Sequence, residues 1–274
     1  MPLSSDSLPA EDIAAYLAFA TRLAETAGAI TRRYFRSDLT VDNKRTDGKF
    51  DPVTAADREA ETAIRRLIAD TYPGHGLHGE EHGLEKASSP FTWVIDPIDG
   101  TRSFIAGVPL WGTLIALNDG ARPVIGLMDQ PYIGEMFVGW PGGAELRTRD
   151  GARPLKTKTT ARLEDALLGC TDPAMFAGKE QTAFQTLEQR CRFRRYGGDC
   201  YFYGLLAAGF FDLIVESGLH AYDIQALMPI IEGAGGIVTG WNGGDPQQGG
   251  QIIAAANAGL HAQALDVLRP AALA

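Results

Sequence analysis

The sequence is poor in cysteine and has no long apolar run. Its 274 residues include three cysteines, none in a CxxC pair: Cys170, Cys191 and Cys200. This odd, scattered set favours buried thiols in a reducing compartment over a disulfide framework. No apolar stretch approaches the roughly 20 residues that a membrane-spanning helix needs, and the first residues lack the basic start and apolar core of a signal peptide. We therefore predict a cytoplasmic protein with no membrane partner.

Basic residues are also in short supply. Lysine and arginine number 25 against 34 aspartates and glutamates, which gives a formal net charge of -9. A surface this acidic argues against nucleic acid as a partner, because phosphate backbones are bound by basic patches. It leaves room for a small phosphorylated substrate, since the charge inside a cleft can oppose the net charge.

What the sequence does contain is an ordinary globular composition, 45% hydrophobic and 22% charged, with two kinds of patterning. Apolar residues recur at helical spacing over 11–36, and a second helix is expected from Thr54 to Tyr72. Three alternating segments between Thr113 and Val138, followed by a hairpin over 144–155, predict antiparallel strands. The first half, 1–155, therefore reads as α+β.

The second half, 156–274, begins after a polar, basic stretch that is a plausible boundary. Strands and helices alternate there, which predicts an α/β arrangement. One of its expected helices runs without interruption over 222–232. The loop 37–50 carries Lys44, Arg45 and Lys49, which could close over a cleft or remain solvated.

The most informative stretch is 93–101. An apolar run, 93–95, is expected to be a buried strand, and Asp96, Pro97 and Asp99 follow where that strand should end. Two carboxylates three residues apart across a stiff turn can point into one cleft, where a cation would offset their repulsion. Oxygen ligands of this kind suit Mg²⁺, or Mn²⁺ as a substitute. The alternative is an Asp-Pro turn that only ends a strand.

Three further acids stand at ends of expected elements. Asp57 completes a capping-box pattern with Thr54, Glu80 ends a short strand, and Asp223 opens a helix. Each has a plain structural explanation, because acids are favoured in the first turn of a helix. Their functional interpretation requires that they converge on Asp96 and Asp99.

The segment around Glu80 also holds His75, His78 and His82. Their spacing suggests zinc, but Gly76 and Gly79 interrupt any helix that would align them, so we expect surface histidines.

Four motifs in order resemble the inositol monophosphatase family. They are 51–57 (DPVTAAD), 79–81 (GEE), 96–101 (DPIDGT), and 222–223 (YD) before the glycine-rich 233–236. The resemblance spans nearly the whole chain. It implies a layered α-β-α-β-α sandwich, usually a homodimer, that hydrolyses phosphate monoesters with two or three Mg²⁺ ions and is often inhibited by lithium.

The resemblance also implies roles for particular residues. The metal ligands would be Glu80, Asp96, the carbonyl of Ile98, Asp99 and Asp223. The attacking water would be activated by Thr101 hydrogen-bonded to Asp57, with Glu80 assisting. Backbone N–H groups of Gly100 and Thr101 would hold the phosphate.

Within the family, three features are similar to the histidinol-phosphate phosphatase branch. Arg102 follows Gly100-Thr101, Asp199 is expected at a helix start beside the leaving group, and Tyr222 replaces a tryptophan typical of inositol enzymes. Asp199 and Glu216 could pair with a cationic substrate, although Asp199 could instead cap its helix, Glu216 end a strand, and Arg102 lie on the surface. The alternatives are an inositol-1-monophosphatase or a broad-specificity sugar or nucleotide phosphatase. A catalytically silent scaffold is disfavoured by the intact set of acids.

Overall fold

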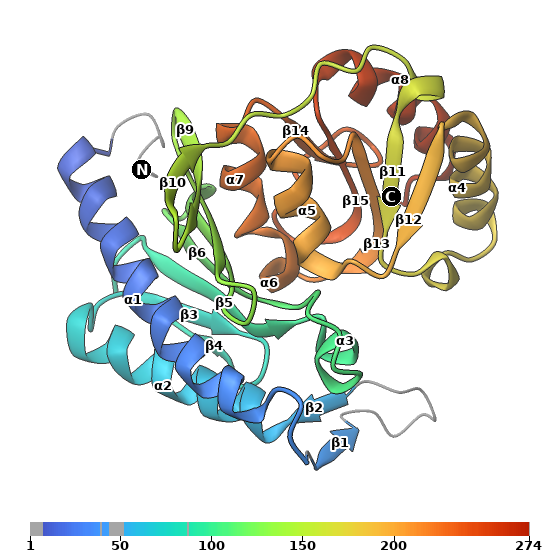
Figure 1. Ribbon diagram of the computed structural model, residues 1–274. Coiled ribbons are helices and arrows are strands. Elements are labelled where there is room, and N and C mark those ends of the chain that lie inside the picture. Colours follow the sequence, from blue (N-terminus) through green and yellow to red (C-terminus); the bar gives the residue numbers. More distant parts are fainter. Residues whose placement is uncertain (1–7, 39, 44–51, 87, 274) are drawn as a thin grey trace.

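The computed structural model describes residues 8–38, 40–43, 52–86 and 88–273. Lys44, Arg45 and Lys49 lie outside these residues. In the described part, five layers follow one another as helices, sheet, helices, sheet and helices (Figure 1). The predicted α-β-α-β-α sandwich is confirmed.

The first layer is a pair of helices, α1 (Ala10–Tyr34) and α2 (Ala55–Thr71). Both are amphipathic, and their apolar faces pack on one side of the first sheet. Thr54 caps α2: its hydroxyl accepts from the amide of Ala56, and the Asp57 carboxylate accepts from the amide of Thr54. The predicted capping box is therefore confirmed. Just before it, β1 (Val41–Asn43) pairs with β2 (Pro52–Thr54).

The second layer is an eight-stranded sheet in the order β10-β9-β8-β7-β6-β5-β3-β4. All neighbours are antiparallel except β3 and β5, which are parallel. The strands are β3 (Gly76–Gly79), β4 (Gly83–Glu85), β5 (Thr92–Asp99), β6 (Gly112–Asn118), β7 (Pro123–Gln130), β8 (Glu135–Trp140), β9 (Gly143–Thr148) and β10 (Gly151–Pro154). The expected hairpin forms the edge of the sheet as β9 and β10.

The central layer and the second sheet come from the second half of the chain. The helices α5 (Asp199–Ala207), α6 (Ala221–Ile224) and α7 (Leu227–Gly233) lie between the two sheets (Figure 1). The five-stranded sheet has the order β12-β11-β13-β15-β14, and α4 (Lys179–Arg190) and α8 (Ala258–Leu268) cover its outer face. Its strands are β11 (Leu167–Cys170), β12 (Phe193–Tyr196), β13 (Leu213–Leu219), β14 (Ile237–Gly240) and β15 (Gly250–Ala255). Short helices complete the chain: α3 (Thr101–Ile105), η2 (Leu163–Asp165), η3 (Pro173–Met175) and η4 (Arg269–Ala271).

Both sheets are apolar on two faces, which explains why they can be sandwiched. In β5, Trp93 and Ile95 belong to the core under α1 and α2, whereas Val94 belongs to the core between the sheets. In β13, Ile214 faces the central core and Val215 the outer one. Side chains of a strand alternate between faces, so each strand contributes to two cores. The three cysteines are free and buried, as expected.

One predicted element is wrong: the uninterrupted helix over 222–232 is two helices, α6 and α7. Pro229 explains the break, because its ring has no N–H to donate and clashes with the carbonyl four residues earlier, at Gln225. Gln225 is buried there; its side-chain amide accepts from Asn118 Nδ2 at 2.9 Å and donates to the carbonyl of Gln247 at 3.0 Å. The break is thus tied to β6 by side-chain hydrogen bonds.

Candidate active site

The two carboxylates of β5 owe their shared direction to an irregularity in the strand. The expected end of the strand at Ile95 is wrong, since β5 continues to Asp99. Its pairing with β6 shifts register between Asp96 and Asp99. In a regular strand, residues three apart point to opposite faces, and a bulge of this kind restores a common side. The Asp96 carboxylate also accepts from the amide of Ile98 at 3.0 Å, inside the bulge.

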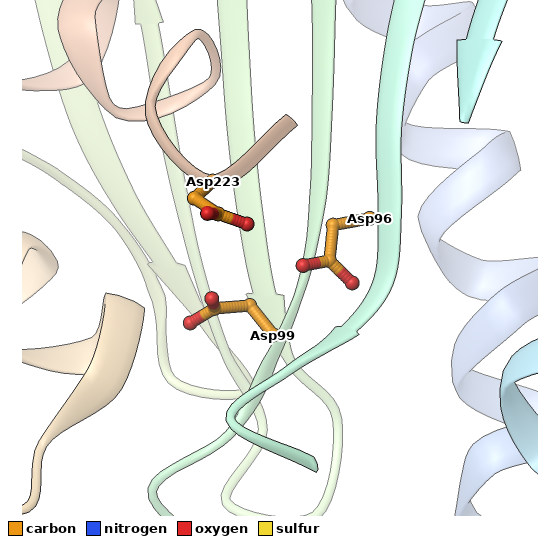
Figure 2. Close-up of side chains that lie close together, drawn as sticks. All are labelled: Asp96, Asp99 and Asp223. Atoms are coloured by element: carbon orange, nitrogen blue, oxygen red, sulfur yellow. The ribbon is translucent and has the colours of Figure 1, made fainter. Parts of the chain in front are cut away.

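Asp223 joins this pair from the second half of the chain. One ligand oxygen from each of Asp96, Asp99 and Asp223 lies within 4.8 Å of the others. The three side chains point toward one another (Figure 2). Burial raises the pKa of Asp96 and Asp99 well above the usual value, and Asp223 adds repulsion to both. A compact set of hard oxygen donors that repel one another fits a divalent cation such as Mg²⁺.

Backbone amides hold two of these acids in place. The carboxylate of Asp99 accepts from the amide of Cys200, at the start of α5, at 2.7 Å. The carboxylate of Asp223 accepts from the amide of His220, which precedes α6, at 2.7 Å. The first bond joins a side chain of the first sheet to a helix of the second half. The two halves are therefore linked at the cluster itself.

Glu80 directly follows β3 and adds a fourth acid beside the cluster. After burial, its charge is the largest cause that raises the pKa of Asp96, and it also raises that of Asp57. The structure therefore brings together Glu80, Asp57 and Asp96, acids that are separated by more than a dozen residues in the sequence. In the described residues, Asp223 therefore meets Asp96 and Asp99, and Glu80 lies near Asp96 and near Asp57.

Asp57 and Thr101 make different hydrogen bonds from those expected. Among the described residues, Thr101 Oγ1 donates to the carbonyl of Ile98 at 3.0 Å and not to Asp57. The hydroxyl lies in the first turn of α3, where it reaches back to a carbonyl three residues earlier. Asp57 Oδ2 accepts from the hydroxyl of Thr54 at 2.6 Å, while its buried Oδ1 has no hydrogen-bond partner. Burial raises the pKa of Asp57 to about 6.

A pocket of about 190 Å³ opens next to the cluster and is lined by acids from both halves of the chain. Asp99 and Asp223 line it together with Asp199 and Glu216. The structure thus brings the two predicted substrate-binding acids to the same pocket as two of the predicted metal ligands.

Asp199 is not a cap of its own helix. It is the first residue of α5, has a positive φ of 43°, and its carboxylate accepts from Ser103 Oγ at 2.7 Å. Such a strained backbone conformation in a non-glycine residue is typical of functional sites. Gly100, with φ of 83°, lies close by: a Cβ there would be 3.0 Å from the Asp199 carboxylate. Burial raises the pKa of Asp199, and the exposed Arg102 lowers it.

Glu216 lies within β13 and does not end it. Its buried carboxylate accepts from the amide of Thr171 at 2.8 Å and from the hydroxyl of Tyr203 at 3.0 Å. Burial raises its pKa to about 7. The contacts made by Ser103 and Tyr203 escaped the sequence-based prediction. Tyr203 follows Asp199 by one helical turn, a spacing that could have suggested a shared face.

The expectation of surface histidines is wrong for two of the three. His75 and His78 are half-buried, and Nδ1 of His75 accepts from the indole of Trp93 at 3.1 Å. His78 packs its ring against Tyr222. In the part of the chain that the structure describes, no group of potential metal ligands includes a histidine.

The layered fold and the partly buried acidic cluster fit a metal-dependent phosphatase. The chain belongs to the inositol monophosphatase family, whose model matches residues 12–270. No helix in the described residues combines the length and the apolar character needed to cross a membrane.

Individual relatives carry two different activities in their names. The chain is 37% identical to the bifunctional phosphatase IMPL2, chloroplastic, of Arabidopsis thaliana, over 97% of this chain and 80% of that protein. It is 34% identical to the histidinol-phosphatase of Mycobacterium tuberculosis, over 92% of this chain and 97% of that protein. It is 32% identical to the inositol-1-monophosphatase of Mesorhizobium japonicum, over 76% of this chain and 79% of that protein.

The solved structure of an inositol monophosphatase from Zymomonas mobilis superposes with a TM-score of 0.84 at 39% identity, covering 95% of this chain and 99% of that one. The chain is about equally identical to relatives of the two activities. These similarities therefore establish the family but do not distinguish between the two substrates.

Proposed function

We propose that the chain is a Mg²⁺-dependent phosphatase that converts L-histidinol phosphate to L-histidinol and phosphate, a step of histidine biosynthesis. The metal ligands are Glu80, Asp96, the carbonyl of Ile98, Asp99 and Asp223, with two or three Mg²⁺ per site and Mn²⁺ as a substitute. Bound metal supplies charge neutralisation for the phosphate and an acidified water.

The protein residues handle the proton and the phosphate. Hydrolysis forms a bond from a water oxygen to phosphorus and breaks the ester P–O bond. A proton of that water therefore needs an acceptor, and the ester oxygen that leaves takes up a proton to become the alcohol. Asp57 supports this role, because burial raises its pKa to about 6, close to the working pH of a general base. Thr101 orients the water and Glu80 assists. The amides of Gly100 and Thr101, together with Arg102, hold the phosphate.

The pairing of Asp199 and Glu216 in one pocket is the observation that carries the choice of substrate. Histidinol phosphate presents an ammonium group and an imidazole, and buried carboxylates form strong, charge-assisted hydrogen bonds with such cations. An inositol ring offers only neutral hydroxyls, which give a buried carboxylate no charge to offset its desolvation. The named histidinol-phosphatase relatives support the same choice.

The second candidate is an inositol-1-monophosphatase or a broad-specificity sugar or nucleotide phosphatase of the same family. It is supported by the names of other relatives at similar identity. The remaining expectation is a proposal of the same kind: a homodimer in the cytoplasm. The division into the halves 1–155 and 156–274 also stays a prediction.

Phosphate release from a panel of histidinol phosphate, inositol 1-phosphate and a nucleoside monophosphate tests the proposal, with Mg²⁺ and with chelator. We expect kcat/KM to be at least tenfold higher for histidinol phosphate. Glu216→Gln should remove most of this preference, because a negative charge in the pocket attracts only the cationic substrate of the panel. Asp212→Asn is a control for the loss of a buried charge outside the pocket: Asp212 precedes the same strand, accepts from the amide of Leu167 and pairs with Lys158. Equal turnover of the whole panel would favour the broad-specificity enzyme.

A further inference from the structure

A fully buried glutamate of α2, Glu61, holds the turn that follows β3. Its Oε2 accepts from the amide of Glu81 at 2.7 Å, and its Oε1 accepts from the amide of His82 at 3.1 Å. Oε1 also receives Nε of Arg65, one helical turn further on, at 2.8 Å. Three donors on one buried carboxylate make a rigid arrangement, because charge-assisted bonds are strong and costly to leave unmade.

Arg65 adds contacts on the far side of the turn. Its guanidinium donates to the carbonyl of Gly83 at 2.6 Å and pairs with the exposed Glu85 at 2.7 Å. Gly79, the last residue of β3, is what allows the approach. A Cβ at this position would lie 2.1 Å from Glu61 Oε1, closer than any side chain tolerates. The glycine before Glu80 thus makes room for the carboxylate.

Glu80 is the first residue of this constrained turn. Its own amide donates to the carbonyl of Ile95 in β5 at 3.3 Å, and the next two amides donate to Glu61. The backbone is therefore held on both sides of Glu80. Glu61 also lies one helical turn after Asp57 on α2, so the same helix carries Asp57 and fixes the backbone beside Glu80.

We propose that Glu61 and Arg65 are positioning residues, a clamp that aims Glu80 at the metal and sets its spacing from Asp57. The proposal rests on the proposed function, in which Glu80 is a metal ligand. Groups that orient a metal ligand without touching the metal change metal affinity by about 10- to 100-fold when they are removed. The clamp should therefore act on Mg²⁺ binding as well as on the stability of the fold.

Glu61→Gln tests the clamp, because the amide keeps the shape and places an N–H₂ group against donors. We expect the Mg²⁺ concentration for half-maximal activity and the calorimetric Kd for Mn²⁺ to rise at least tenfold together. The kcat at saturating Mg²⁺ should stay within about threefold of the parent. Glu59→Gln is the matched control, since it removes the same charge from the same helix on the side facing Tyr34 and Arg33. A Kd for Mn²⁺ within about twofold of the parent would overturn the clamp.

Two further measurements keep the proposal open to refutation if Glu61→Gln fails to fold. Gly79→Ala keeps glutamate at position 61, but the added methyl group pushes its carboxylate away from the turn. This variant should weaken Mn²⁺ binding as Glu61→Gln does. In the unaltered protein freed of metal, the amides of Glu81 and His82 should exchange slowly by NMR, and fast exchange would contradict the clamp. Glu80→Gln separates the proposed metal ligand from the proposed clamp. Unchanged Mn²⁺ affinity in Glu80→Gln would refute Glu80 as a ligand. Weakened affinity in Glu80→Gln, together with normal affinity in Glu61→Gln, would refute the clamp alone.

Discussion

Thr101 is the side chain whose proposed role differs most from the contact it makes. Its hydroxyl donates to the carbonyl of Ile98, a proposed metal ligand, and Thr101 follows Gly100, whose φ is positive. Thr101→Ala should lower kcat by about 10²- to 10⁴-fold, as lost proton handling usually does. Thr101→Ser keeps the hydroxyl and should retain most of the activity. Near-full kcat in the alanine variant, measured by phosphate release, would refute the role.

The sequence predicted the side chains of the site that belong to a motif. It did not predict those that matter only through contacts made in the folded chain. Asp96, Asp99 and Asp223 follow from motif order, and the structure places their oxygens within 4.8 Å of one another. Ser103 and Glu61 carry no motif. Their importance comes from contacts with residues that are far away in the sequence, Asp199 and His82, which no local pattern reveals.

Among helices and strands, the spacing of apolar residues predicted the long elements. It failed where contacts with another element determine the local structure. The helices α1 and α2 lie where the apolar periodicity placed them. The bulge in β5 depends on its register with β6, so the sequence of β5 alone could not disclose it. The break between α6 and α7 could have been found, because Pro229 inside a helical pattern signals an interruption.

The approach of the α6–α7 break to the first sheet depends on Gly126 of β7. A Cβ there would lie 1.9 Å from the carbonyl oxygen of Ala226. Gly126→Ala should therefore push this segment off the sheet, destabilise the fold by about 1 to 3 kcal/mol, and weaken Mn²⁺ binding by moving Asp223. The control is Gly259→Ala in α8, where the nearest atom would be 3.5 Å away. Unfolding curves and calorimetry measure both effects, and wild-type values for Gly126→Ala would contradict this account.

The molecule as a whole places its site where the two sheets and the central helices meet. Asp99 lies on the first sheet, and the second half supplies Asp223 and the amide of Cys200. The layer order was expected from the family resemblance, and it agrees with strands that carry apolar residues on both faces and must be covered twice. The motifs implied that acids of the two halves meet, but not the contacts that hold them there, such as the hydrogen bonds of Gln225 to Asn118 and Gln247.

Because acids of both halves share one cation in this account, metal should stabilise the whole fold. A ligand that binds only the folded state adds about 2.7 kcal/mol at a concentration 100 times its Kd. The sign of the pH dependence follows from Asp96 and Asp99, whose pKa values are raised in the fold by burial and by the charges of neighbouring acids. The metal-free fold therefore favours their protonated forms and loses stability as pH rises through those values. Metal requires the ionised forms, so the rise in Tm on adding Mg²⁺ should be larger at about pH 8 than at about pH 5. Asp223→Asn should abolish most of that rise, and a Mg²⁺ effect independent of pH and of Asp223 would mean that the cation binds elsewhere.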